Sequence, residues 1–311
     1  MKKISILTPC YNEQENVDAL ISKVRKTMAL LVDRYEYEFI FIDNCSTDGT
    51  VDALKKYAKD DDRIKIIVNT RNFGHIRSPH YGLLQTTGDC VVLLVADLQD
   101  PPELISEFVE HWEHGYKIVA ARKTKSREHP VMYFLRGVYY KLLGKFSDIP
   151  LLEQFMGFGL YDKCVIDVLR ELNEPYPYFR GLISDVGFEI KEVEYTQNKR
   201  KDGETKNNFY TLFDMAMLGF TNHTKIPLRL ATLTGFFGAF VSLLVGVVYL
   251  VYKLLFWNSI SVGIAPLVIG LFFAASIQLF FLGVVGEYVG SIFTYVQNRP
   301  LVIEKERINF K

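Results

Sequence analysis

The sequence predicts an α/β fold with a mostly parallel sheet, followed by an interfacial helix and two transmembrane helices. Short apolar segments alternate with segments of helical periodicity from the N-terminus to about residue 206. Two apolar stretches without a charged residue then occupy 230–252 and 260–286. Each is long enough to cross a bilayer, which takes about 20 residues. The chain therefore divides into a polar domain and a membrane part.

The composition excludes several classes of protein. The 311 residues include 36 Lys and Arg and 36 Asp and Glu, and this zero net charge argues against general nucleic-acid binding. The histidines have no spacing typical of a zinc hydrolase. The cysteines form no C-x-x-C pair and all lie in the polar part, so we expect reduced thiols in a cytosolic domain. They are Cys10, Cys45, Cys90 and Cys164.

The alternating elements of the polar part are predicted in order from their apolar spacing. Asp48 is the predicted N-cap of the second helix, and Pro101-Pro102 opens the fourth because proline suits a first helical turn. The run from Cys90 to Ala96 is continuously apolar, as expected of a central parallel strand. The predicted strands are 4–8, 38–42, 64–68, 90–96 and 118–121, and the predicted helices are 15–32, 50–58, 78–86 and 101–114.

Polar residues follow three of these strands. Pro9 to Glu13 come after the first, Asp43 after the second and Asp97 after the fourth. Ligands of parallel sheets bind at the carboxyl ends of the strands, so these three segments are predicted to line one crevice.

The acidic run Ala96-Asp97-Leu98-Gln99-Asp100-Pro101-Pro102 indicates a metal and nucleotide diphosphate site. Asp97 and Gln99 are two residues apart, so an extended chain turns both to one side. Their oxygens are suitable ligands for Mg²⁺ or Mn²⁺. Taken alone, the run is equally well explained as a polar cluster that caps the helix after it.

The rest of the polar part is less regular. A basic helix contains Arg136, a loop is predicted over Phe155–Gly159, and a basic, glycine-containing loop covers 197–208. The segment 209–220 is rich in Phe, Leu and Met. It is interpreted as a helix lying on a membrane surface, in preference to one facing a core.

Basic residues flank the outer ends of the two apolar stretches, and Trp257-Asn258-Ser259 forms a short hairpin between them. Lys225 and Arg229 precede the first stretch and Arg299 follows the second, so the positive-inside rule places both ends and the polar domain in the cytoplasm. The predicted divisions are a domain over 1–206, an interfacial helix and linker over 207–228, a two-helix hairpin over 229–299 and a cytosolic tail over 300–311.

An ordered set of motifs resembles the family 2 glycosyltransferases, and more narrowly the polyprenyl-phosphate glycosyltransferases. That group includes dolichyl-phosphate mannose synthase and bactoprenol glucosyltransferases. The motifs are Pro9-x-Tyr11-Asn12-Glu13, Asp43-x-x-Ser46-x-Asp48-Gly49-Thr50, Arg71-Asn72-Phe73-Gly74, Ala96 to Pro102, Arg180-Gly181-Leu182-Ile183, Arg200-x-x-Gly203-x-Thr205-Lys206 and Gly286-Glu287-Tyr288.

The resemblance implies a nucleotide-diphospho-sugar transferase domain of the GT-A type. It implies inverting, metal-dependent transfer of a sugar from a nucleotide sugar, with UDP favoured by family habit, to polyprenyl phosphate. The reaction would take place at the cytosolic face of the cell membrane, as in the synthesis of cell-envelope glycans. A homo-oligomer is left open.

The resemblance also implies roles for individual residues. Asp97 would be the catalytic residue, close to the diphosphate, and Asp97 and Gln99 would ligate Mg²⁺ or Mn²⁺. Residues that would hold the base and ribose of the donor are Pro9, Tyr11, Glu13 and Asp43, and residues that would meet phosphate groups are Arg122, Arg136, Arg200 and, more weakly, Lys206.

The chain departs from the family pattern at two of these sites. Val95 stands where the family usually has the first carboxylate of Asp-Ala-Asp, and Asn44-Cys45 stand where it usually has Asp-Gly. These departures support one alternative, a decayed transferase that acts as a membrane scaffold. The other alternative is a processive polysaccharide synthase, but neither Trp112 nor Trp257 lies in the Gln-x-x-Arg-Trp motif of that class.

Overall fold

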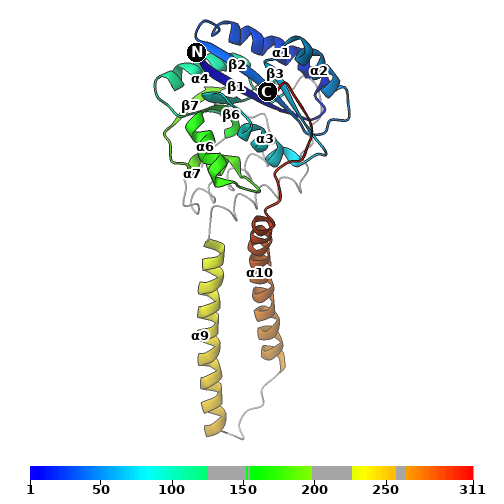
Figure 1. Cartoon of the computed structure of the whole chain (residues 1–311). Helices are drawn as coiled ribbons and strands as arrows, with labels where there is room; N and C mark the ends of the chain where they lie inside the picture. The colour runs from blue at the N-terminus through cyan, green and yellow to red at the C-terminus, as the bar shows by residue number, and fades with distance from the viewer. Residues whose placement is uncertain (125–151, 153–154, 198–225, 257–263, 311) are drawn as a thin grey trace.

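The computed structural model describes residues 1–124, 152, 155–197, 226–256 and 264–310. In this part of the chain, eight strands form one sheet in the order β7-β5-β6-β4-β1-β2-β3-β8, of which Figure 1 labels β1, β2, β3, β6 and β7. The strands are β1 Lys2–Cys10, β2 Tyr35–Asp43, β3 Ile64–Asn69, β4 Cys90–Leu93, β5 Ile118–Lys123, β6 Phe155–Asp162, β7 Ile190–Tyr195 and β8 Glu304–Ile308.

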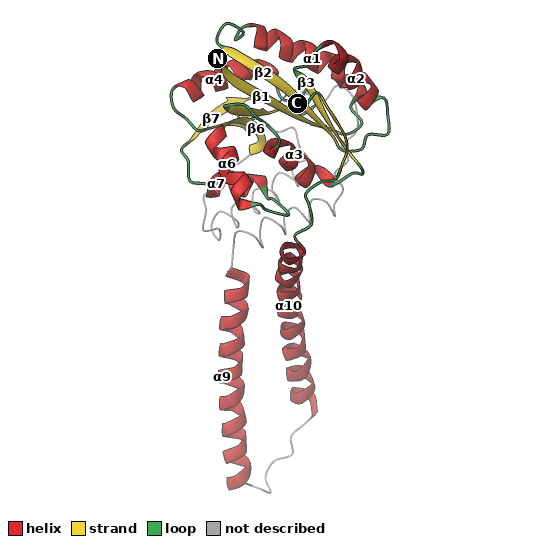
Figure 2. Ribbon diagram, in the orientation of Figure 1, coloured by secondary structure: helices red, strands yellow, loops and turns green. Residues whose placement is uncertain are grey.

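Helices cover both faces of the sheet (Figure 2). One apolar core joins it to α1, α2 and α4, and a second joins it to α3, α6 and α7. These helices are α1 Gln14–Ala29, α2 Thr50–Asp60, α3 Gly74–Leu84, α4 Ile105–Glu113, which a 3₁₀ turn over Pro102–Leu104 precedes, α6 Lys163–Leu172 and α7 Phe179–Asp185.

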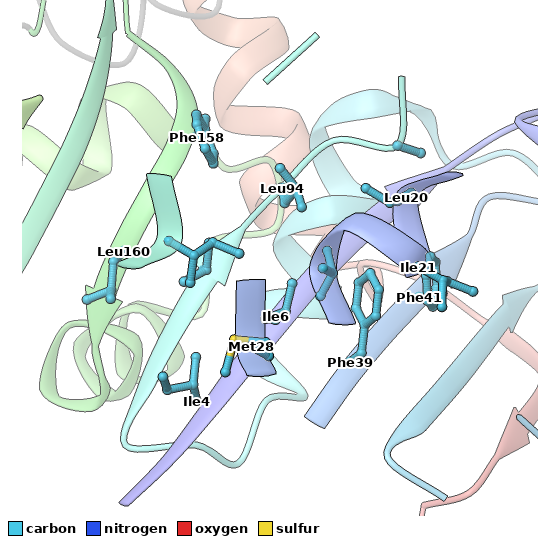
Figure 3. Close-up of a cluster of buried hydrophobic side chains, with 14 of the residues drawn as sticks. Ile4, Ile6, Leu20, Ile21, Met28, Phe39, Phe41, Leu94, Phe158 and Leu160 are labelled. Carbon is cyan, nitrogen blue, oxygen red and sulfur yellow. The ribbon is translucent and has the colours of Figure 1, made fainter. Parts of the chain in front are cut away.

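The two cores follow from the period of two along each strand. Ile4 and Ile6 of β1 point into the first core, where α1 lies against the sheet, while Leu7 points into the second. Figure 3 shows Ile4, Ile6, Phe39 and Phe41 among the buried side chains of the first core. The predicted alternation of strands and helices is confirmed.

The sheet is mixed, but most of its pairs are parallel. β1 pairs in parallel with β2 and β4, β2 with β3, and β5 with β7, whereas β6 and β8 run antiparallel to their neighbours. The predicted strands are found with small shifts at their ends. β4 is shorter than expected and stops at Leu93, and α3 begins at Gly74, earlier than predicted.

The prediction of a loop over Phe155–Gly159 is wrong, because this segment begins strand β6. Its glycines suggest a loop, but Gly159 serves close packing within the sheet. A Cβ atom at Gly159 would lie 2.3 Å from the carbonyl oxygen of Val119 in β5. Glycine therefore allows β5 and β6 to pair at this position.

Residues 300–311, set apart as a tail in the sequence analysis, return to the sheet. β8 runs antiparallel to β3 and pairs Glu304 with Asn69 and Ile308 with Ile66. Since Asn69 is the last residue of β3, the chain enters β8 at the carboxyl edge of the parallel strands. The polar domain is therefore built from both ends of the chain.

Two long helices, α9 Ile226–Leu255 and α10 Ile264–Gln297, extend away from the domain on the same side (Figure 1). They contain apolar stretches of membrane-spanning length at Leu228–Val248 and Gly270–Gln297. Large apolar side chains such as Phe236 and Phe272 are exposed on their surfaces. The predicted loop at 197–208 lies outside the described residues except for Gln197, and the predicted interfacial helix at 209–220 and hairpin at 257–259 lie outside them entirely.

Candidate active site

The loops after β1 and β2 are joined by hydrogen bonds into one unit at the carboxyl edge of the sheet. The Asn12 amide donates to the Ser46 hydroxyl at 2.9 Å, and the Thr47 amide donates to Asn12 Oδ1 at 2.8 Å. The Glu13 amide donates to Thr50 Oγ1 at 2.9 Å. Two of the three predicted crevice segments are therefore held against each other.

Asp43 is the fully buried anchor of this unit. Its Oδ2 accepts a 2.9 Å hydrogen bond from the Ser46 amide, and its Oδ1 accepts the Ser46 hydroxyl. Burial raises the pKa of Asp43, although the bonds from Ser46 act in the opposite direction. In this structure, both carboxylate oxygens hold the shape of the loop.

The N-terminus of α2 differs from the prediction in one residue. Gly49 is the N-cap, not Asp48. The Asp48 carboxylate still accepts the first helical amide, that of Thr50, at 3.0 Å. The same carboxylate accepts the Gln14 amide at 3.3 Å, so Asp48 joins the two loops as well as the helix end.

Asn44 is a site residue that the sequence analysis noted only as a departure from the family pattern. Its Nδ2 donates to Asn72 Oδ1 at 2.9 Å and to the Gly74 carbonyl at 3.2 Å. Its Oδ1 accepts Asn69 Nδ2 at 3.1 Å and the Phe73 amide at 2.9 Å. This use of both donor and acceptor needs an amide, because an ionised aspartate has no donor.

Each of the three crevice loops contains a residue other than glycine in the left-handed region. The φ angles are 56° at Asn12, 65° at Cys45 and 56° at Leu98. Asparagine adopts this region readily, but a bulky residue such as leucine rarely does. Such strained residues gather at functional sites. In the described part of the chain, the other non-glycine residues in this region are the asparagines Asn173, Asn298 and Asn309. The strain at Cys45 and Leu98 is therefore confined to the strand ends of the predicted donor site.

The third loop carries the acidic run. Asp97 is partly buried and its Oδ1 accepts the Gln99 amide at 3.1 Å. Asp100 is buried, and this burial raises its pKa to about 6, even though the Tyr195 hydroxyl donates to its Oδ1 at 2.5 Å; the nearby charge of Asp97 raises it further. Val95, at the position of the missing carboxylate, is 40% exposed.

The remaining predicted site residues fall into two groups. Pro9, Tyr11 and Glu13 lie at or just after the end of β1 and are partly exposed. Arg122 lies near the carboxyl end of β5, where its Nη1 forms a 3.0 Å ion pair with Glu192. Arg136, Arg200 and Lys206 lie outside the described residues.

The possible metal ligands of this site suit an ion that a substrate also binds. Among the described residues, no group of three or more His, Cys, Asp or Glu side chains is arranged to hold an ion. Mg²⁺ is usually bound by one or two carboxylates together with substrate phosphates and water. Asp97 fits that arrangement, but the extended chain predicted over 97–99 is wrong, because the segment turns at Leu98 and the Gln99 amide donates to Asp97.

The family of the chain follows from comparison with known proteins. The model of glycosyl transferase family 2 matches residues 5–166, which include all three crevice loops. The chain belongs to this family and is a glycosyltransferase, as predicted. Within the family, its relatives include bactoprenol glucosyl transferases, which confirms the resemblance to the polyprenyl-phosphate group.

Two relatives match almost end to end. The bactoprenol glucosyl transferase of Shigella phage SfII is 33% identical over 98% of this chain and 98% of its own. The uncharacterized glycosyltransferase YkcC of Bacillus subtilis is 34% identical over 96% of this chain and 92% of its own. Among solved structures, glucosyl-3-phosphoglycerate synthase from Mycobacterium tuberculosis covers 71% of this chain and 76% of its own with a TM-score of 0.49 and 18% identity.

Proposed function

We propose that this glycosyltransferase moves a sugar from a nucleotide sugar, expected to be a UDP sugar, to polyprenyl phosphate at the cytosolic face of the cell membrane. The observation that carries the proposal is the orientation of the sheet. Helix α10 ends at Gln297 and β8 begins beside Asn69 at the carboxyl edge. The edge that bears Asp43 and Asp97 is therefore the one next to the apolar helices.

This orientation suits a lipid acceptor. Apolar side chains exposed along α9 and α10 need a nonpolar environment, and a bilayer provides one for helices of this length. A polyprenyl tail would stay in the bilayer, so only its phosphate would have to reach the crevice. A crevice at the opposite edge of the sheet would lie beyond the reach of that phosphate. The names of the relatives support the same acceptor.

In this proposal, the loops after β1 and β2 bind the donor. Pro9, Tyr11 and Glu13 contact the base and ribose, and Asp43 keeps its loop in the required shape. The diphosphate lies toward Asp97, with Mg²⁺ or Mn²⁺ held by Asp97 and Gln99. When bound, the ion supplies positive charge that stabilises the departing diphosphate.

The reaction needs little proton transfer. A phosphomonoester has a second pKa of about 6, so the lipid phosphate is already an anion near neutral pH. One of its oxygens attacks the anomeric carbon of the sugar, and the bond from that carbon to the diphosphate oxygen breaks. The nucleoside diphosphate leaves with the electron pair, and the configuration at the carbon is inverted. Arg122, Arg136 and Arg200 are the proposed cationic contacts to these phosphates.

A donor screen tests the proposal. Purified full-length protein in vesicles that contain polyprenyl phosphate is given labelled UDP, GDP and other nucleotide sugars, with Mn²⁺ or with EDTA. We expect transfer of label to lipid from one UDP sugar, dependent on the ion, with inversion seen by NMR of the product. Activity in EDTA equal to that in Mn²⁺ would contradict the metal assignment. Label in a water-soluble polymer would instead favour the processive synthase.

A further inference from the structure

Arg71 and Arg77, which are close in the sequence, meet the distant Arg299 next to the end of α10. Arg71 lies in the loop after β3 and Arg77 on α3, and their guanidinium carbons lie 4.0 Å and 5.8 Å from the centre of the Phe73 ring. Arg77 Nη2 donates to the carbonyl of Pro300, which directly follows Arg299. We call Arg71, Arg77 and Arg299 the arginine cluster.

The arginine cluster concentrates positive charge. In the part of the chain that the structure describes, no salt bridge involves any of the three, whereas Arg34, Arg63 and Arg122 each pair with an acid. Burial lowers the pKa of Arg77, and the charges of Arg71 and Arg299 lower it further, against an opposite effect of Tyr176. Arg77 Nε is also buried without a hydrogen-bond partner.

A phosphate group is the ligand that fits these properties. Guanidinium groups bind phosphate oxygens through paired, charge-assisted hydrogen bonds. A phosphate would offset the repulsion within the cluster and give the exposed guanidinium of Arg299 a partner. Arg71 and Arg77 are also steadied by their contacts with Phe73, so less conformational freedom would be lost on binding.

The place of the cluster indicates where that phosphate comes from. Arg299 lies two residues beyond the end of α10, and basic residues at the end of a membrane span lie at the level of the lipid headgroups. β3 is separated from β4 by β1 and β2, which is about 14 Å at ordinary strand spacing. The acceptor phosphate has to react near Asp97, which follows β4, whereas Arg71 follows β3, so we assign a different phosphate to the cluster.

We propose that Arg71, Arg77 and Arg299 bind the phosphate of an anionic phospholipid of the bilayer and so hold the carboxyl edge of the sheet against the membrane. The inference rests on the membrane placement of α10 in the proposed function. It adds a lipid site separate from both the donor and the acceptor sites. The bound lipid would fix the height of the crevice above the membrane.

Native mass spectrometry of the full-length protein tests this site. The protein is delipidated in detergent and given equal amounts of phosphatidylglycerol and phosphatidylcholine. We expect the wild type to retain phosphatidylglycerol preferentially. The variant Arg77→Gln/Arg299→Gln should retain it roughly tenfold less tightly, as expected for lost charge-assisted bonds. Arg34→Gln/Arg63→Gln removes the same charge from the opposite edge and should behave as the wild type.

Several results would overturn the proposal. Equal retention of the two lipids by the wild type would do so, as would unchanged retention by Arg77→Gln/Arg299→Gln. The exposed Arg299→Gln alone should weaken retention, which guards against a folding defect at Arg77. Displacement of phosphatidylglycerol by short-chain polyprenyl phosphate would mean that the cluster is the acceptor site. Release of the protein from membranes by alkaline carbonate would instead contradict the membrane placement in the proposed function.

Discussion

Buried carboxylates at the two ends of the parallel strands have pKa values shifted in opposite directions. In the amino-terminal half of β2, Glu38 is buried, yet it accepts hydrogen bonds from the Ser5 hydroxyl, Lys65 Nζ and the Thr87 amide. Burial alone would raise the pKa of Glu38, but these bonds and one from Lys3 lower it to about 2. This carboxylate is held in its charged form.

At the carboxyl edge, the pKa values of Asp43 and Asp100 are raised instead, because burial outweighs their hydrogen bonds. The left-handed residues Asn12, Cys45 and Leu98 lie at this edge too. The carboxylate at the amino end of the strands therefore stabilises the fold. The buried carboxylates and left-handed residues at the carboxyl edge destabilise it. Strained and poorly neutralised groups are expected where a protein binds and reacts.

The largest effect should come from Asp97→Asn. The change removes the charge proposed to hold the ion and keeps the shape of the side chain, so transfer should fall by about 10²–10³. The melting temperature should stay close to that of the wild type. Initial rates at saturating donor test this, with Asp52→Asn on the exposed face of α2 as the matched control. If Asp97→Asn and Asp52→Asn lose activity equally, the assignment of the active site to the carboxyl edge of the sheet is wrong.

Glu38→Gln should produce the reverse result, a loss of stability with activity retained in the folded protein. The folded pKa of about 2 lies below the ordinary value of 4.5, so the charged group stabilises the fold above pH 4.5. That stabilisation, about 3 kcal/mol, is lost as the pH falls toward 2. Thermal melting of wild type, Glu38→Gln and the exposed control Glu36→Gln from neutral pH downward measures it. If Glu38→Gln showed the same pH dependence as the wild type, the stabilising role of the charged Glu38 would be contradicted.

Asn44→Asp should affect donor binding more than turnover. An aspartate cannot donate to Asn72 and Gly74, so the loop after β2 should lose two of its hydrogen bonds to the loop after β3 and keep the one from the Phe73 amide. We expect the KM for the nucleotide sugar to rise about tenfold, equivalent to about 1.4 kcal/mol, with kcat nearly unchanged. Asn173→Asp, the same change at an exposed site after α6, is the control. A fall in kcat alone would assign Asn44 to the chemical step.

Cys45→Gly should have the smallest effect and the opposite sign. Glycine adopts the φ of 65° found at Cys45 without strain, although it also gains freedom in the unfolded chain. The net result should be a stabilisation of about 0.5 kcal/mol. Cys45→Ala keeps the Cβ atom and should bring no such gain. Equal melting temperatures for the two variants would show that Cys45 is not strained.

The local parts of this architecture are predictable from sequence, and the distant pairings are not. The periodicity of α1 and the apolar runs of β1 to β3 reflect burial within each segment, and they predict those elements. The acidic run and the Pro9 to Glu13 motif likewise predict which strand ends form the candidate site. Asp97 can therefore be proposed from the sequence alone.

Asn44, β6 and β8 depend on contacts with residues far away in the chain. The role of Asn44 depends on the loop after β3, and Gly159 is explained only by Val119 on the neighbouring strand. β8 contains Glu304, Lys305, Glu306 and Arg307, which suggest a solvated tail. Charged residues are also common in edge strands, because they prevent pairing with other molecules. Composition alone therefore does not distinguish a solvated tail from an edge strand.

The strand β8 also has a consequence for the synthesis of the protein. β3 is made early, but its edge partner β8 follows both long helices in the chain. At about 5–20 residues per second, a ribosome needs tens of seconds to make the intervening segment. During that time the edge of β3 stays open, and it closes only after α9 and α10 have been made. Completion of the enzyme domain is thereby delayed until both long apolar helices have left the ribosome.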